Sequence, residues 1–211
     1  MPGRFFYRAI PVILGLAAGC STDNAIVQSP SGKGGSMARF AVNGNYLYVA
    51  GKSTIEVFAI DPGFEKINSI DVGFGLETIF VRAPYLYLGA FDAMYIYSIA
   101  DPSLPEFIFR YSHIVSCDPV VVEGSRAYVT LRSGSGCNRG VNALEIIDIS
   151  NPMAPELVSN FPMANPHGLA VRDKFLFLCE GQYGLKVFDI TNEKKHRVGL
   201  PTACPSCLRC H

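Results

Sequence analysis

The sequence predicts an all-β protein built from a repeated unit of four short strands. One strand of aromatic and aliphatic residues recurs four times along the chain, anchored by Tyr48, Tyr87, Tyr128 and Phe177. These anchors lie 39, 41 and 49 residues apart, and a period of about 40 in a strand-rich chain is typical of a β-propeller blade. The strands are also apolar at nearly every position, as expected of sheets that are buried on both faces.

The strands of each unit follow one another in a constant order. The first strand ends in valine, and a turn rich in glycine, proline, asparagine or aspartate leads into the aromatic strand. The third strand is followed by aspartate or asparagine, with proline next in three of the units, which suits a fourth strand at the edge of a sheet. The expected first strands are 40–42, 79–81, 120–122 and 169–171; the second strands are 46–49, 85–88, 127–130 and 175–178; the third strands are 55–60, 94–99, 144–149 and 185–190; the fourth strands are 64–70, 107–111 and 156–161.

The third strands and the residues after them resemble a known repeat. Residues 57–62 have the sequence VFAIDP, residues 144–152 LEIIDISNP, and residues 185–192 LKVFDITN. This pattern is similar to the LVIVD repeat of bacterial cell-surface and secreted β-propellers, and the resemblance covers residues 37–192. It implies a propeller fold and a location outside the cytoplasm, but no particular reaction. The chain contains no tryptophan, which argues against a propeller of the WD-repeat type.

Residues 1–19 have the features of an export signal. Arg4 and Arg8 accompany an apolar run, residues 9–18, that is too short to span a bilayer. Small residues then precede Cys20, and this pattern resembles the lipobox of bacterial lipoproteins, in which the cysteine is acylated and becomes the mature N-terminus. We therefore expect lipidation at Cys20 and, because Ser21 follows, anchoring to the outer membrane or cell surface. The alternative is an ordinary secretory signal in which the cysteine occurs by chance.

A flexible tether is expected between the lipid and the folded part of the chain. Residues 28–36, QSPSGKGGS, are rich in glycine and serine and should behave as flexible coil. The expected organisation is therefore a signal at 1–19, a tether at 20–36, propeller blades at 37–192 and a disordered cysteine-rich tail at 193–211.

The third unit carries an insertion, residues 132–141, between its second and third strands. An insertion in one repeat forms a loop on one face, often the face that binds; the alternative is a tolerated surface excursion. In an oxidising compartment Cys137 of the insertion could form a disulfide with Cys117, which precedes the same unit; the alternative is a pair of thiols. Cys179, at the end of an aromatic strand, is expected to act as a small buried hydrophobe.

Three polar residues stand in the connections that lead into first strands. Glu77, Asp118 and His167 could face one mouth of the central axis, where carboxylates and an imidazole could bind a cation or a polar ligand. The alternative is that they are turn-forming residues and a solvated histidine. The sequence contains no phosphate loop, nucleophile elbow, zinc-protease helix or paired-carboxylate motif. It therefore indicates no catalytic residue and no cofactor.

The tail holds a cluster of potential metal ligands. Residues 207–211, CLRCH, match the attachment pattern of c-type haem, and Cys204, Cys207, Cys210 and His211 could supply four zinc ligands. Because haem needs an enclosing pocket and zinc sites usually have wider paired spacing, we interpret the cluster as structurally incidental.

The repeat stops after Asn192, with three complete units and most of a fourth. Propellers close with about four to eight blades. The chain is therefore expected to be an incomplete propeller that either closes by association or is truncated from a longer one, and truncation is our hypothesis.

The overall charge bears on the kind of partner. Eighteen basic residues balance eighteen acidic ones, so the sequence does not predict nucleic-acid binding, which requires a clustered basic surface. The sequence predicts a membrane-anchored extracytoplasmic module that binds or scaffolds a protein or glycan, without catalysis. The alternative is a secreted enzyme or a metal- or haem-binding protein that uses the axial residues or the tail.

Overall fold

Four antiparallel sheets make up the fold. The computed structural model describes residues 37–73, 75–112, 119–133 and 141–191. Within these residues, three sheets have four strands and one has three, and in every sheet the strands are hydrogen-bonded in the order in which they occur in the chain. Each sheet corresponds to one sequence repeat, so the predicted all-β architecture of four-stranded blades is confirmed.

The strands lie close to the segments expected from the sequence. Blade 1 consists of β1 (Phe40–Asn43), β2 (Tyr46–Ala50), β3 (Thr54–Ala59) and β4 (Glu65–Asp71); blade 2 of β5 (Leu76–Arg82), β6 (Tyr85–Ala90), β7 (Ala93–Ser98) and β8 (Glu106–Ser112); blade 3 of β9 (Val120–Glu123), β10 (Arg126–Leu131), β11 (Ala143–Asp148) and β12 (Glu156–Pro162); blade 4 of β13 (Leu169–Arg172), β14 (Phe175–Cys179), the 3-10 turn η1 (Gly181–Tyr183) and β15 (Leu185–Asp189).

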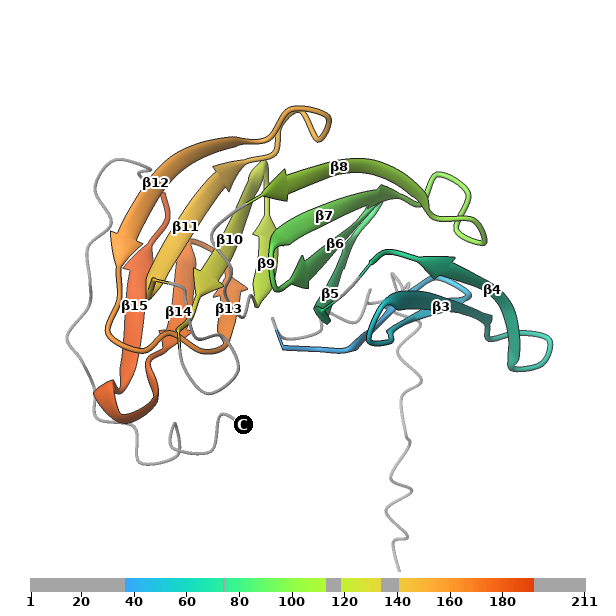
Figure 1. Cartoon of the computed structure of the whole chain (residues 1–211), viewed down its shortest axis with the longest axis horizontal. Helices are drawn as coiled ribbons and strands as arrows, with labels where there is room; N and C mark the ends of the chain where they lie inside the picture. Colours follow the sequence, from blue (N-terminus) through green and yellow to red (C-terminus); the bar gives the residue numbers. More distant parts are fainter. Residues whose placement is uncertain (1–36, 74, 113–118, 134–140, 192–211) are drawn as a thin grey trace, which may run out of the picture.

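The blades are arranged around their first strands. β1 contacts β5, β5 contacts β9, and β9 contacts β13. The sheets fan out from these first strands into an arc, with β4, β8 and β12 at the outer rim (Figure 1). The described chain therefore has the geometry of neighbouring propeller blades, about three and a half to four in number, as the sequence predicts.

The uniformly apolar strands follow from burial on both faces. Successive side chains of a strand point to opposite faces of the sheet. In β6, Leu86 packs in the core between blades 1 and 2, whereas its neighbour Tyr87 packs in the core that blade 2 shares with blade 3. A strand in this position has no solvent-facing side, so every side chain must be apolar or satisfied by a partner.

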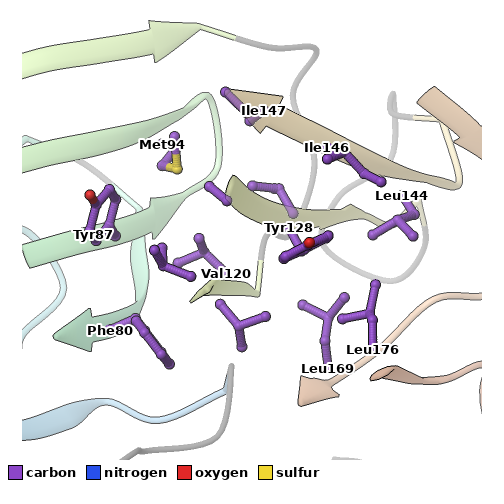
Figure 2. Close-up of a cluster of buried hydrophobic side chains, with 14 of the residues drawn as sticks. Phe80, Tyr87, Met94, Val120, Tyr128, Leu144, Ile146, Ile147, Leu169 and Leu176 are labelled. Atoms are coloured by element: carbon purple, nitrogen blue, oxygen red, sulfur yellow. The ribbon is translucent and has the colours of Figure 1, made fainter. Parts of the chain in front are cut away.

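Two hydrophobic clusters hold the arc together. One lies between blades 1 and 2, and the other runs continuously from blade 2 through blade 3 to blade 4. Figure 2 shows the second cluster: Val120 and Tyr128 of blade 3 lie between Tyr87 of blade 2 and Leu176 of blade 4. Blade 2 thus contributes one face to each cluster.

Hydrogen bonds tie neighbouring blades at defined points. The hydroxyl of Tyr48 donates to the carbonyl of Pro102 in blade 2 at 2.8 Å, and the hydroxyl of Thr130 donates to the carbonyl of His167 at 2.9 Å, joining blade 3 to blade 4. Burial between the blades raises the pKa of the Tyr87 phenol to about 12. The blades are therefore docked by polar contacts as well as by apolar packing.

One strand boundary differs from the sequence prediction by more than two residues. The first strand of blade 2 was expected at residues 79–81, but β5 begins at Leu76. Leu76 is 3% exposed and lies opposite Ala90, so burial of its side chain extends the strand. Glu77, expected in a loop, is instead part of this strand.

Candidate functional site

The strand directions define two faces of the arc. Because neighbouring strands are antiparallel, the connection between the second and third strands of a blade lies at the same end as the connection from one blade to the next. We call this end the loop face; its described connections are residues 51–53, 72–73, 75, 91–92, 119, 132–133, 141–142, 163–168 and 180–184. The opposite end, the turn face, carries the tight turns between first and second strands at residues 44–45, 83–84, 124–125 and 173–174.

A charged cavity lies on the loop face between blades 1 and 2. Its volume is about 350 Å³. One guanidinium nitrogen of Arg39, Nη2, donates to the carbonyls of Gly51 at 2.8 Å and Leu76 at 3.1 Å, which holds the arginine across the two blades. The cavity therefore has a positioned cation in its wall. The residues that line it are Arg39, Lys52, Gly75, Leu76, Glu77 and Phe91.

Backbone geometry shapes the floor of this cavity. Gly75 has a φ of +81°, which favours glycine, and a Cβ at this position would lie 2.6 Å from Cδ2 of Phe91. The amide of Phe91 donates to the carbonyl of Gly75 at 3.1 Å. A residue with a side chain at position 75 would displace the phenylalanine ring, so the close approach of these two connections depends on glycine.

Glu77 enters this cavity from an irregular strand. Leu76 pairs with Ala90 and Thr78 pairs with Gly89, so Glu77 is the extra residue of a β-bulge. Bulges turn a side chain away from the direction that a regular strand would give it. Glu77 thus adds a carboxylate to a wall that already holds Arg39 and Lys52.

A second polar cluster lies on the loop face of blade 4. The amide of His167 donates to the carbonyl of Cys179 at 2.8 Å, which fixes the backbone of the connection between blades 3 and 4. Gly181 has a φ of +57°, and a Cβ there would lie 3.0 Å from Nδ2 of Asn165 and 3.1 Å from Nε2 of His167. Both side chains therefore approach the backbone of η1 closely.

A buried ion pair stands beside this cluster. The Glu180 side chain is fully buried. Its Oε1 accepts a hydrogen bond from the amide of Ala164 at 2.7 Å, and its Oε2 lies 2.6 Å from Nζ of Lys186. Sequence analysis missed this pair. The available signal was Lys186 itself, a charge between the apolar residues Leu185 and Val187 that needs a partner where the strand is covered.

The surroundings of His167 favour its neutral form. Burial lowers the pKa of the imidazole below its usual value of 6.5, and the positive charge of Arg132 acts in the same direction. A histidine whose pKa is depressed by folding binds a proton more readily in the unfolded chain. It therefore contributes stability above its unfolded pKa, and this contribution is lost as pH falls through the folded value.

We expect His167→Gln to make the stability of the fold less sensitive to acid. Below a pH of about 6.5, protonation of the imidazole opposes folding of the natural chain, whereas glutamine carries no titrating group. Urea unfolding at pH 7.5 and pH 5.0 measures the effect, as a larger fall in the free energy of unfolding for the natural chain than for the variant. Equal falls in the two proteins would contradict this assignment. Arg132→Ala is the companion variant and should reduce the fall in part.

The turn face carries a different set of charges near the axis. A cavity of about 380 Å³ lies among the ends of the first strands, with Asn43, Arg82 and Glu123 in its lining. Nη1 of Arg82 in blade 2 lies 3.8 Å from Oε1 of Glu123 in blade 3, and both side chains are partly exposed. This pair joins two blades but contributes little to stability, because solvent screens it.

Of the three residues predicted to face the axis, the structure describes Glu77 and His167. Glu77 and His167 both lie on the loop face, but they belong to blades 2 and 4 and are separated by blade 3. Their role as ligands of a cation or polar molecule stays a prediction. Cys179 is 8% exposed, as expected of a buried small residue. The following predicted residues lie outside the described residues: Cys20, Cys117, Asp118, Cys137, Cys204, Cys207, Cys210 and His211.

The described residues contain neither a metal-ligand cluster nor a helix that could cross a membrane. In that part of the chain, no three His, Cys, Asp or Glu side chains come together in a group able to hold a metal ion. No helix within the same residues is long and apolar enough to cross a membrane.

Comparisons with solved structures agree with the observed architecture. The computationally designed Ika8 protein superposes with a TM-score of 0.59 at 15% identity, over 78% of this chain and 49% of that one. The designed Ika4 protein gives 0.57 at 14% identity, over 77% and 94% of the two chains. BamB from Moraxella catarrhalis gives 0.56 at 9% identity, over 77% and 47%. The chain thus spans about half the length of Ika8 and BamB, and at these identities the likeness shows the fold alone.

Sequence comparison finds the same repeat in two segments of the chain. No curated protein matches the chain. The model of the LVIVD repeat matches residues 34–55 and 139–162, which include β1, β2, β11 and β12. Together with the blade architecture, these matches show a β-propeller that carries LVIVD repeats in the matched residues.

Proposed function

We propose that this protein is a membrane-anchored, extracytoplasmic propeller that binds or scaffolds a protein or glycan and catalyses no reaction. The observation that carries the binding role is the loop-face cavity between blades 1 and 2. It presents two cations and a carboxylate, from Arg39, Lys52 and Glu77, above a rigid apolar scaffold. Polar groups fixed at the rim of a shaped cavity are the usual means of orienting a ligand.

Rigidity of the scaffold supports a role in binding. Arg39 is held by backbone carbonyls of two blades, and Gly75 and Phe91 fix the adjoining connections. Side chains held in this way lose little conformational entropy when a partner binds, which favours affinity. Loops carried on a rigid framework are also where binding residues concentrate in proteins.

The anchoring part of the proposal rests on the N-terminal sequence. Cys20 follows a short apolar run and small residues, and sixteen residues separate it from Met37, the first described residue. A glycine- and serine-rich segment of that length gives a folded domain clearance from a bilayer. Acylation at one cysteine with several chains would provide stable anchoring, whereas a single chain gives only marginal binding.

Metabolic labelling with a fatty-acid probe in a bacterial host tests the anchor. We expect the natural chain to incorporate the label and to fractionate with membranes, and Cys20→Ala to abolish both. Cys204→Ala is the matched control and should keep the label, because it removes a cysteine outside the lipobox. A natural chain that takes up no label would end the anchoring proposal, and label retained in Cys20→Ala would assign it to another residue.

A photocrosslinking amino acid tests the binding surface in the same cells. Placed at Lys52, which is exposed on the loop face, it should yield a discrete crosslinked product outside the cytoplasm. Placed at Lys174, a lysine exposed in a turn of the opposite face, it should yield none. Equal crosslinking from the two positions would contradict a loop-face binding site, whether or not the chain is acylated.

A further inference from the structure

Blade 1 has an apolar face that none of the other described blades covers. In an antiparallel sheet, residues directly opposite each other share a face. Phe40 lies opposite Val49, Val42 opposite Leu47, and Leu47 opposite Phe58, so these five side chains form one surface. Blade 2 packs on the other face of the sheet, through residues such as Tyr48 and Ile55. We call this uncovered surface the leading face.

All of these positions except that of Val42 are buried in every other blade. The position of Phe40 corresponds to Ile79, Val120 and Leu169 in blades 2, 3 and 4. Phe40 is 61% exposed, whereas the other three are 1%, 0% and 4% exposed. The position of Phe58 behaves likewise, since its counterpart in blade 4, Phe188, is 1% exposed. The leading face therefore has the composition of a blade junction without the neighbouring blade.

Blade 4 has the complementary surface at the other end of the arc. Ala170 lies opposite Phe177, and Phe177 lies opposite Val187. These three side chains point away from blade 3 and are exposed or half-buried. Their counterparts in blade 1, Ala41, Tyr48 and Val57, are 4%, 0% and 0% exposed. We call this surface, completed by Leu185, the trailing face.

The leading face of blade 1 and the trailing face of blade 4 are as complementary as the pairs of faces that meet inside the arc. At each internal junction, a trailing face packs on the leading face of the next blade, so the chemistry required is already present three times in this chain. Phe177 lacks the hydroxyl by which Tyr48 reaches the next blade. A junction between the two end faces would therefore be apolar at this position, with no buried hydroxyl left unsatisfied.

Charges at the axis are compatible with a junction of the two ends. The last residues of β1, β5, β9 and β13 are Asn43, Arg82, Glu123 and Arg172. The pair Arg82 and Glu123 already spans one junction at 3.8 Å. Joining the end faces would bring Arg172 beside Asn43, which is neutral, so no two like charges become neighbours around the axis.

The extent of the described arc fits a second copy as the partner. The Ika8 and BamB structures superpose on this arc with only 49% and 47% of their chains, whereas Ika4 superposes with 94% of its chain. Two arcs of this size therefore provide the length of one larger propeller. A twofold axis would place each leading face on the trailing face of the partner, giving two equal junctions in a closed ring.

We propose that two copies of this chain associate through their leading and trailing faces and complete a propeller ring. The association is independent of lipidation and of any ligand at the loop face. It buries the exposed side chains of Phe40 and Phe177 in both copies. It also gives blade 1 and blade 4 the second neighbour that blades 2 and 3 already have.

Sedimentation velocity of the full chain in mild detergent tests the proposal at about 10 µM, a concentration at which a junction of domain-core character holds two chains together. We expect a species of twice the monomer mass.

Two variants alter one end face each: Phe40→Glu alters the leading face and Ala170→Glu alters the trailing face. Both positions are exposed in the single chain, so the substitutions should leave its fold intact. Each variant alone should raise the dissociation constant more than about 100-fold, because a carboxylate is buried at both junctions.

Mixing the two variants distinguishes this arrangement from other dimers. An equimolar mixture contains pairs in which one junction joins an intact leading face to an intact trailing face. The mixture should therefore recover a species of twice the monomer mass that neither variant forms alone. Phe107→Glu, at an exposed position of β8 away from both end faces, is the control and should leave the natural mass unchanged.

Three results would overturn the proposal. One is a natural chain that stays monomeric at about 100 µM, well above the dissociation constants of stable dimers. Another is a mixture of the two variants that stays monomeric. The third is a series of species that grows beyond two copies with concentration, which would indicate an open, non-closing contact.

Discussion

Replacing Phe188 with alanine should lower the free energy of unfolding by about 3–5 kcal/mol. The ring is 1% exposed and belongs to the cluster that runs from blade 2 to blade 4. It lies opposite Leu176 in the sheet, and its centroid is 6.3 Å from that of Phe161 in blade 3. The substitution removes apolar contacts on both sides of a junction and leaves a cavity that neighbouring strands cannot fill. Urea unfolding monitored by circular dichroism measures the change.

Phe107→Ala is the matched control for this substitution. Phe107 also makes an aromatic contact, with Tyr97 at 5.7 Å, but it lies on an outer strand and is 57% exposed. Its loss should cost less than about 1.5 kcal/mol, the upper range for an aromatic pair. Equal losses for the two variants would show that blade 4 is not docked on blade 3 by this cluster.

Replacing Lys186 with methionine should destabilise the fold by about 3–5 kcal/mol, because it leaves the buried carboxylate of Glu180 without its cation. Glu180 is fully buried, and Nζ of Lys186 lies 2.6 Å from its Oε2. Methionine keeps most of the aliphatic length of lysine, so the loss reports the missing charge rather than a cavity. The free energy of unfolding from urea titration is the measurement.

The double variant Lys186→Met, Glu180→Gln separates charge from packing. Glutamine keeps an oxygen that can accept the hydrogen bond from Ala164, so the double variant should recover most of the stability that Lys186→Met loses. Arg82→Met provides an exposed comparison, since the pair of Arg82 with Glu123 is half-exposed and should contribute no more than about 1 kcal/mol. A double variant as unstable as the single one would contradict the assigned pairing.

The architecture could be predicted from the sequence because each repeat contains local patterns that mark its strands and turns. Strands such as residues 85–90 are apolar on both faces, and Asp-Pro or Asn-Pro pairs mark the approach to the outer strand, so strand order follows from the sequence alone. The start of β5 was wrong because Leu76 belongs to the strand through a bulge at Glu77. A bulge depends on pairing with β6, which no local pattern encodes.

The candidate site could be predicted less well than the fold. The loop face follows from strand order, but the cavity beside Arg39 depends on contacts between two blades. The Glu180–Lys186 pair was missed for a similar reason. Glu180 directly follows an aromatic strand and looks like a solvated loop residue until the connection between blades 3 and 4 covers it. Burial of a charge is a tertiary property, and only the position of Lys186 between Leu185 and Val187 indicated it.

The division of the hydrophobic interior into two clusters has a consequence for how the molecule unfolds. Within the described residues, blade 1 packs on the rest of the arc through the cluster and the hydrogen bonds that it shares with blade 2, whereas blades 2 to 4 share another cluster. The blades therefore form a linear array in which the stability of each blade depends mainly on its direct neighbours, as in a one-dimensional Ising model. The terminal blade is the weakest cooperative unit, and its opening leaves the remaining array folded. Closing the array into a ring would abolish this weak end and turn local fraying into a single all-or-none transition.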